Sequence, residues 1–243
     1  MQGVLYVSHG TRLKAGEEEA IDFLTSIQHS IDAQLQEICF LEICAPSIEE
    51  GVKRLVDRGA TAIAVVPILL LSAGHDKHDI PEELAKVTQQ YPEIVFRYGA
   101  PLGVQERLVH VLVERIHATA ADIAKYESIL LVGRGSHMLS VQQDIEAIAT
   151  MLSEKVDKPV DVAYLAACKP AFTEKLDQLG TEQKKKVIVA PYLLFDGLLF
   201  QSMIKKVEQY NQDNSAQLLL SHCLGEHEMV KQAFIQRVNQ ALG

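Results

Sequence analysis

The sequence repeats itself, and this repeat limits the folds that the chain can adopt. VSHG at 7–10 is followed by VGRG at 132–135, so the two motifs lie 125 positions apart. LEICAPS, VVPILLL and LG in the first half reappear as LAACKPA, VAPYLLF and LG, at offsets of 124, 124 and 122. Four landmarks in the same order, at nearly constant spacing, indicate a duplicated unit. We therefore expect two similar domains, at residues 1–125 and 126–243.

Within each half, short apolar segments alternate with longer amphipathic ones. VLYVS, EICFLE, TAIAVVPILLL and IVFRYG are the expected strands of the first half, and SILLVG begins the second. This alternation predicts an α/β fold in which helices flank a parallel sheet. Runs such as IAVVPILLL are apolar without alternating, which is typical of strands that helices cover on both faces.

The composition excludes several classes of function. The net charge of −9 disfavours nucleic-acid binding, which depends on Lys and Arg neutralising phosphates. The only basic run, Lys184–Lys186, is expected to lie in a solvated loop. No apolar run reaches the roughly 20 residues that a membrane-spanning helix needs, and the first residues lack the features of a secretion signal. We expect a cytoplasmic protein that binds neither nucleic acid nor membranes.

The cysteines are far apart in the sequence and form no CxxC pair. Reduced thiols in the core are therefore expected, rather than disulfides or a thiolate zinc site. A metal site would have to use histidine and carboxylate ligands. The four cysteines are Cys39, Cys44, Cys168 and Cys223.

Three side chains that can bind a metal fall at the ends of the first three predicted strands. His9 follows the first strand, Glu42 closes the second, and His75 follows the third. Ligands of parallel sheets bind beyond the carboxyl ends of the strands, so these residues should share one edge. The second copy lacks all three, which predicts an asymmetric site. Its corresponding residues are Arg134, Ala166 and Leu199.

Two imidazoles and a carboxylate suit a borderline divalent ion such as Fe²⁺, Co²⁺, Ni²⁺ or Zn²⁺. Three protein ligands leave coordination positions open, which favours chemistry or metal delivery over storage. Each residue also has a structural alternative. His9 can satisfy a turn, Glu42 can be a solvated strand end, and His75 can be an ordinary loop residue.

The segment after His75 contains a helix-start pattern. Pro81 is a good first helical residue, and Asp79 stands in a natural capping position before it. We therefore expect Asp79 to be a helix cap. His78 is a secondary candidate, for orienting the loop or assisting proton transfer.

Cationic and polar residues surround the expected site and suggest an anionic substrate. Each of them can instead be an ordinary surface residue, and a serine before a helix can be a cap. The candidates for substrate binding are Arg12, Lys14, Lys77, Arg134 and Ser136.

VLYVSHGTR, FLEICAPSIEEG and VVPILLLSAGHDKHDIPEE resemble the class II chelatase superfamily, and within it the two-domain bacterial sirohydrochlorin ferrochelatases. The resemblance implies two chelatase-like domains with a cleft between them. It also implies insertion of Fe²⁺ into sirohydrochlorin to give siroheme, with release of two protons and without an organic cofactor. By the same resemblance, His9 and His75 are the active histidines and Glu42 is a further metal ligand.

Other functions remain open on the residues alone. The long sirohydrochlorin cobaltochelatases of cobalamin synthesis share these motifs, so Co²⁺ or Ni²⁺ can replace Fe²⁺ as the metal. A cytoplasmic metal carrier would use the same ligands without catalysis. Two histidines and a carboxylate also suit a mononuclear metal oxygenase or hydrolase.

Overall fold

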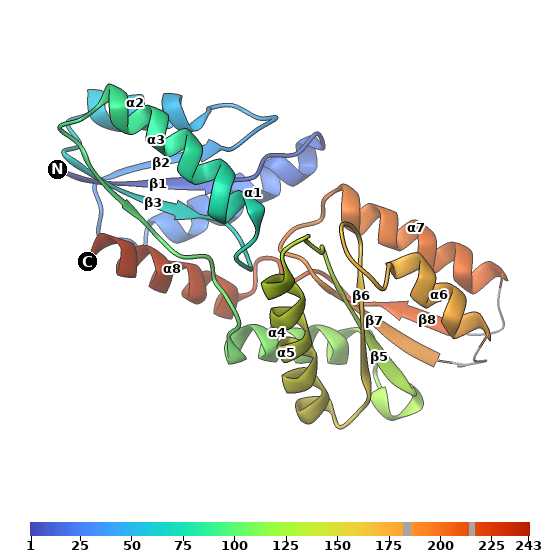
Figure 1. The fold of residues 1–243 in the computed structure, drawn as a ribbon. Coiled ribbons are helices and arrows are strands. Elements are labelled where there is room, and N and C mark those ends of the chain that lie inside the picture. Colours follow the sequence, from blue (N-terminus) through green and yellow to red (C-terminus); the bar gives the residue numbers. More distant parts are fainter. Residues whose placement is uncertain (182–185, 214–216) are drawn as a thin grey trace. The chain divides into compact units, whose positions relative to one another are not determined.

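Two four-stranded parallel sheets form the framework of the protein (Figure 1). The computed structural model describes residues 1–181, 186–213 and 217–243. Lys184 and Lys185 of the basic run lie outside these ranges. The strands of the first sheet are β1 (Gln2–Ser8), β2 (Leu35–Phe40), β3 (Ala62–Pro67) and β4 (Val95–Tyr98). Those of the second are β5 (Ser128–Gly133), β6 (Val160–Tyr164), β7 (Lys186–Tyr192) and β8 (Gln217–Leu220).

The two sheets share one topology. Their strand orders are β2-β1-β3-β4 and β6-β5-β7-β8, and all neighbouring strands are parallel. The predicted α/β fold and the internal duplication are confirmed. The cleft expected between the two halves stays a prediction.

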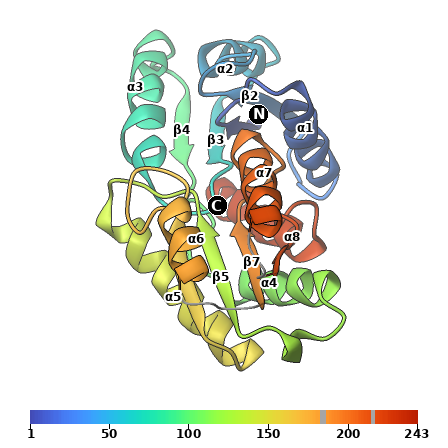
Figure 2. The same ribbon diagram turned by 90° about the vertical axis from the view of Figure 1, so that its right-hand side faces the viewer.

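Helices cover the sheets. The first four are α1 (Lys14–Gln28), α2 (Ile48–Asp57), α3 (Ile80–Gln90) and α4 (Glu106–Thr119). The others are α5 (Leu139–Val156), α6 (Phe172–Thr181), α7 (Leu198–Asp213) and α8 (Glu228–Leu242). A π-helical turn, η1 (His75–Asp79), precedes α3, and a 3₁₀ turn, η2 (Ile123–Lys125), follows α4. Figure 1 and Figure 2 show α2 and α3 on one side of the first sheet, away from α1 and α8.

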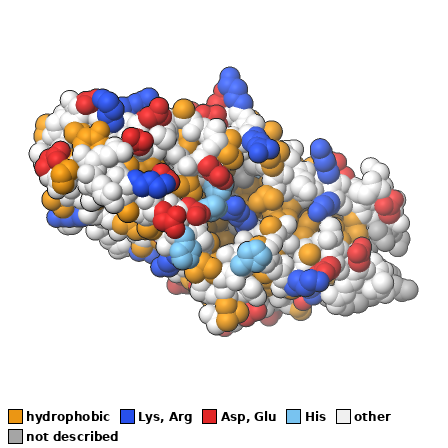
Figure 3. Space-filling view, turned by 45° about the horizontal axis from the view of Figure 1, so that its top comes forward, with side chains coloured by type: hydrophobic (Ala, Val, Ile, Leu, Met, Phe, Trp, Pro, Cys, Tyr) orange, Lys and Arg blue, Asp and Glu red, His pale blue; other side chains and the backbone are white. Residues whose placement is uncertain are grey.

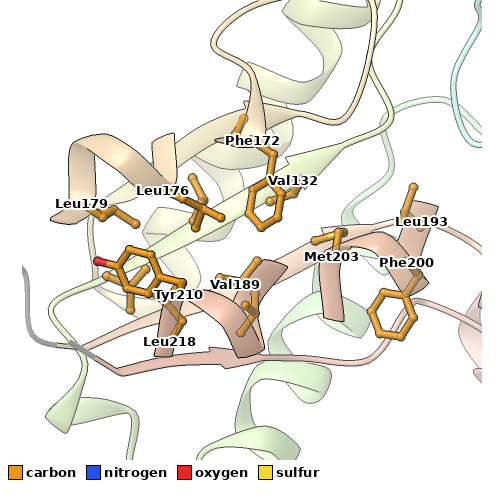
Figure 4. Close-up of a cluster of buried hydrophobic side chains, with 14 of the residues drawn as sticks. Val132, Phe172, Leu176, Leu179, Val189, Leu193, Phe200, Met203, Tyr210 and Leu218 are labelled. Atoms are coloured by element: carbon orange, nitrogen blue, oxygen red, sulfur yellow. The ribbon is translucent and has the colours of Figure 1, made fainter. Parts of the chain in front are cut away.

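Apolar side chains between sheet and helices form the core of each half. In the second half, Phe172 and Leu176 of α6 meet Met203 of α7 over the strand residues Val132 and Val189 (Figure 4). These side chains are at most 7% exposed, so their burial stabilises the fold by about 1.5–3 kcal/mol for each large residue. An equivalent cluster fills the space between the first sheet and the helices α2 and α3.

The compact units of the structure differ from the expected halves. One unit comprises residues 1–103 and 231–243, and the other comprises 104–230. Helix α4 therefore packs in the second unit, although it follows the first sheet, and most of α8 packs in the first. Two arginines mark this exchange. Arg115 of α4 donates to the carbonyl oxygen of Leu224 at 2.9 Å, and Arg237 of α8 donates to that of Leu102 at 2.6 Å.

The end of β3 departs most from the sequence prediction. β3 ends at Pro67 instead of continuing through the leucines. Beyond it, the carbonyl oxygens of Leu69 and Leu70 accept hydrogen bonds from the amides of Leu102 and Gly103, at 3.0 and 2.8 Å. The chain thus leaves the sheet early and runs as a loop towards His75.

All four cysteines are free thiols, but only two of them lie in the core as expected. Cys39 and Cys223 are buried, and Cys44 and Cys168 are half-buried. Burial raises the pKa of the Cys39 thiol well above its usual range, which keeps it protonated and unreactive. Within the described residues, none of the helices combines the length and apolar character needed to cross a bilayer.

Candidate metal and active site

Parallel strands bring the three predicted ligands to one edge of the first sheet. β1 lies between β2 and β3, so the chain directly after β1 has both other strand ends as neighbours. Pairing continues past the strands, because the amide of Glu42 donates to the carbonyl oxygen of His9 at 3.1 Å. Gly10 permits this close approach. It has φ +94°, and a Cβ at this position would lie 1.9 Å from the Glu42 carbonyl oxygen.

The two histidines meet although 66 residues separate them. Nε2 of His9 lies 2.9 Å from Nε2 of His75, and the perpendicular rings have centroids 4.3 Å apart. Oε1 of Glu42 lies 3.4 Å from Nε2 of His9. The imidazoles are about one-quarter exposed, at 26% and 24%, and Glu42 is 53% exposed. Figure 3 shows histidine side chains reaching the surface beside acidic ones.

The partners of the other ring nitrogens determine where the protons lie. Nδ1 of His9 is 3.1 Å from the carbonyl oxygen of Gly10, and Nδ1 of His75 is 2.6 Å from Oδ2 of Asp79. A carbonyl and an ionised carboxylate only accept hydrogen bonds, so both Nδ1 atoms must carry hydrogen. In the neutral rings, two Nε2 lone pairs then face each other. That contact is repulsive unless a proton or a cation lies between them.

The distances from His9 to the other two predicted ligands are compatible with a shared metal ion as well as with a proton. Ligand atoms about 2.0–2.2 Å from a shared ion lie roughly 3–3.5 Å from one another. The distances from Nε2 of His9 to Nε2 of His75 and to Oε1 of Glu42 are 2.9 and 3.4 Å. Among the described residues, however, no group of three His, Cys, Asp or Glu side chains is already arranged to hold a metal. The complete ligand set of His9, Glu42 and His75 therefore stays a prediction.

The prediction that Asp79 caps a helix is wrong. Its backbone is helical, with φ −66° and ψ −49°, and its side chain makes no capping hydrogen bond. The π-helical turn η1 runs directly into α3, so no free helix end needs a cap at this position. The carboxylate contacts His75 instead. Such a partner fixes the orientation and tautomer of a metal-binding imidazole.

A second carboxylate that the sequence did not indicate anchors the same turn. Asp76 is buried, at 4% exposure, and accepts hydrogen bonds from Ser72 and, at 3.0 Å, from the hydroxyl of Tyr98 on β4. Burial, with a smaller contribution from the Asp76 charge, raises the pKa of Tyr98 and keeps the phenol a donor. Nζ of Lys77, a predicted substrate-binding group, lies 3.7 Å from the Asp76 carboxylate.

The other predicted substrate-binding residues follow β1 and β5. Arg12 is exposed before α1, and Nζ of Lys14 lies 3.4 Å from Glu18. Arg134 and Ser136 follow β5 in the second unit. The Ser136 hydroxyl accepts a hydrogen bond from the amide of Met138 at 3.2 Å, which is the local turn contact expected before a helix.

Comparison with known proteins identifies the family. The sequence model of the CbiX family matches the chain twice, over residues 3–119 and 128–241. The chain belongs to the CbiX family. The two matches of this CbiX protein correspond to its two sequence repeats, and they cover nearly its whole length.

This CbiX protein is similar to sirohydrochlorin chelatases in sequence and in structure. It is 44% identical to a sirohydrochlorin ferrochelatase of Priestia megaterium, over 94% of this chain and 86% of that protein. The structure of SirB from Bacillus subtilis with Fe³⁺ matches with a TM-score of 0.88 and 38% identity, over 99% and 95% of the chains. A sirohydrochlorin chelatase SirB of Bacillus subtilis subspecies spizizenii, in complex with cobalt, matches with a TM-score of 0.84 and 37% identity, over 99% and 94%.

Proposed function

We propose that this protein is a sirohydrochlorin ferrochelatase, which inserts Fe²⁺ into sirohydrochlorin to form siroheme. The observation that carries the proposal is the pair of facing imidazoles. Their Nε2 atoms lie 2.9 Å apart, and both Nδ1 atoms contact acceptors. The 44% identity to the Priestia megaterium sirohydrochlorin ferrochelatase supports sirohydrochlorin as the substrate.

The reaction exchanges one divalent ion for two protons. In the proposal, His9, His75 and Glu42 hold Fe²⁺ as a substrate, and the ring nitrogens of sirohydrochlorin replace them as the metal passes to the macrocycle. An open ligand set favours this transfer, because a closed four-ligand cage would retain the ion. Neutral imidazole nitrogens released from the metal can accept the two pyrrole N–H protons. The site then holds positive charge before and after insertion.

Sirohydrochlorin carries several carboxylates, while the protein has a net charge of −9. Local cations must therefore attract the substrate. We assign this role to Arg12, Lys14, Lys77 and Arg134, with Ser136 as a hydrogen-bond donor.

Reversing one of these charges should weaken substrate binding. Arg12→Glu is expected to raise KM for sirohydrochlorin several-fold, and more strongly at low salt, where charge interactions are less screened. Lys53→Glu, which makes the same charge change on the exposed side of α2, is the control and should leave KM unaltered. An unchanged KM in Arg12→Glu would remove Arg12 from the substrate site.

An absorption assay tests the proposed reaction. Under anaerobic conditions, the protein with sirohydrochlorin and Fe²⁺ should convert the absorption of the free ring to that of siroheme, over many turnovers and faster than the spontaneous reaction. A metal carrier would instead bind the ion stoichiometrically without turnover. Rates no faster than the spontaneous reaction with every metal tried would contradict the proposal.

Cobalt insertion is the second candidate function, because one similar SirB structure contains cobalt. Running the same assay with Co²⁺ and Ni²⁺ distinguishes the candidates by kcat/KM. A higher value for Co²⁺ than for Fe²⁺ would reassign the protein as a cobaltochelatase with the same site.

A further inference from the structure

Ile43, next to Glu42, has an unusual backbone conformation. Its φ is +71°, in the left-handed region, where a β-branched side chain is a genuine outlier. The side chain is 55% exposed, so packing in the core compensates for little of this strain. Isoleucine is thus unfavourable at this position for two reasons: its branched side chain disfavours the left-handed backbone, and its apolar surface is exposed to water. Strained residues of this kind cluster at functional sites.

The second repeat provides an internal comparison. Ala167 occupies the matching position with φ +64°, and the flanking hydrogen bond is the same. The amide of Cys44 donates to the Glu42 carbonyl oxygen at 2.8 Å, as Cys168 does to Ala166 at 2.8 Å. The left-handed backbone therefore belongs to the duplicated loop and does not require isoleucine. The large apolar side chain occurs only in the repeat that carries the two histidines and the glutamate.

The neighbours of Ile43 hold it beside the site. Glu42 is bonded to the backbone of His9, as described above. Sγ of Cys44 lies 3.4 Å from the amide nitrogen and 3.2 Å from the carbonyl oxygen of Thr11, in the His9 loop. Both residues next to Ile43 thus contact the same loop. Ile43 therefore lies in a loop at the carboxyl edge of the sheet, next to the loop that carries His9, and its side chain is exposed.

We propose that Ile43 is a substrate-binding residue that contacts the apolar face of the tetrapyrrole. This inference rests on the proposed function and adds a residue to it. A flat macrocycle that presents its nitrogens to the histidines must cover the adjacent protein surface, and an exposed branched side chain is a suitable contact for it. Because this contact is the same before and during insertion, it should strengthen binding and leave kcat unaltered.

Substitutions at Ile43 test the contact. Ile43→Ala and Ile43→Gly are expected to weaken binding of metal-free sirohydrochlorin, followed by absorption, by about 10-fold. KM for the ring should rise in parallel, while kcat and KM for Fe²⁺ stay unchanged. Ile43→Leu keeps the apolar area and should bind nearly as well as the wild type. Relief of strain should also raise the Tm of Ile43→Gly, by about 2 °C.

Ala167→Gly is the matched control, since it relieves the same backbone conformation in the other repeat. It should raise Tm without affecting sirohydrochlorin binding. Unchanged binding in Ile43→Ala and Ile43→Gly would overturn the inference, and so would a lowered Tm, which would show that the side chain supports the fold. Because binding is measured without metal, a wild-type protein that binds the ring but inserts no metal contradicts the proposed function alone.

Discussion

Replacing His9 or His75 with alanine is expected to lower the rate of metal insertion by at least about 100-fold. Each substitution removes one of the two Nε2 atoms that lie 2.9 Å apart, and with it a metal ligand and a proton acceptor. The effects should not add in the double variant, because the pair acts as a unit. Insertion rates for the single and double variants, measured by the absorption assay, check this expectation.

His78→Ala is the matched control for these variants. His78 lies in the same π-helical turn as His75 and is exposed. Its removal should leave the rate within a factor of two or three. All variants should keep the far-ultraviolet circular dichroism of the wild type, since none of these side chains belongs to the buried core. Wild-type rates in both His9→Ala and His75→Ala would refute the assignment of the site.

The meeting of the predicted ligands at one sheet edge could be expected from sequence, because it depends mainly on topology. Parallel strands place their carboxyl ends at one edge. His9 and Glu42, which follow β1 and β2 directly, are therefore neighbours, whereas His75 reaches them through the loop that follows β3. The second repeat strengthened the prediction, because it keeps the glycine that follows the first strand but none of the three predicted ligands.

The supporting residues could not be predicted, because their partners are chosen by tertiary contacts. Asp79 before Ile80 and Pro81 matches a helix-start pattern. However, η1 precedes α3 without a break, so the Asp79 carboxylate is not needed as a cap and contacts His75. The hydroxyl of Tyr98 on β4 donates to Asp76 in η1, 22 residues away in the sequence. No local rule relates the two residues.

The sequence also did not indicate that α4 packs in the second unit and most of α8 in the first. Both helices have an apolar face, and such a face fits either of two sheets that share one topology. Sequence order favours the nearer sheet. The contacts of Arg115 and Arg237 show that each helix packs with the other sheet. The two contacts are equivalent in the two repeats, because each arginine donates to the carbonyl oxygen of the matching leucine, Leu224 or Leu102.

Asp79→Ala should have the second largest effect, a loss of about 10–100-fold in metal affinity and insertion rate. Without the carboxylate, the Nδ1–H of His75 loses its 2.6 Å acceptor, and the ring can turn or change tautomer. The lone pair of His75 Nε2 is then no longer held in the direction of His9. Titration with Co²⁺, followed by its visible absorption, measures the affinity separately from the rate.

Two further substitutions separate this positioning role from a structural one. Asp79→Asn keeps an oxygen that can accept from Nδ1 but removes the charge, so it should recover part of the lost affinity. Glu82→Ala removes an exposed carboxylate from the first turn of α3 and should change neither affinity nor rate. If Asp79→Ala lowered Tm and left Co²⁺ affinity unaltered, Asp79 would act on the helix after all. The opposite pattern is expected, because the Asp79 side chain makes no capping hydrogen bond, whereas its carboxylate contacts His75 directly.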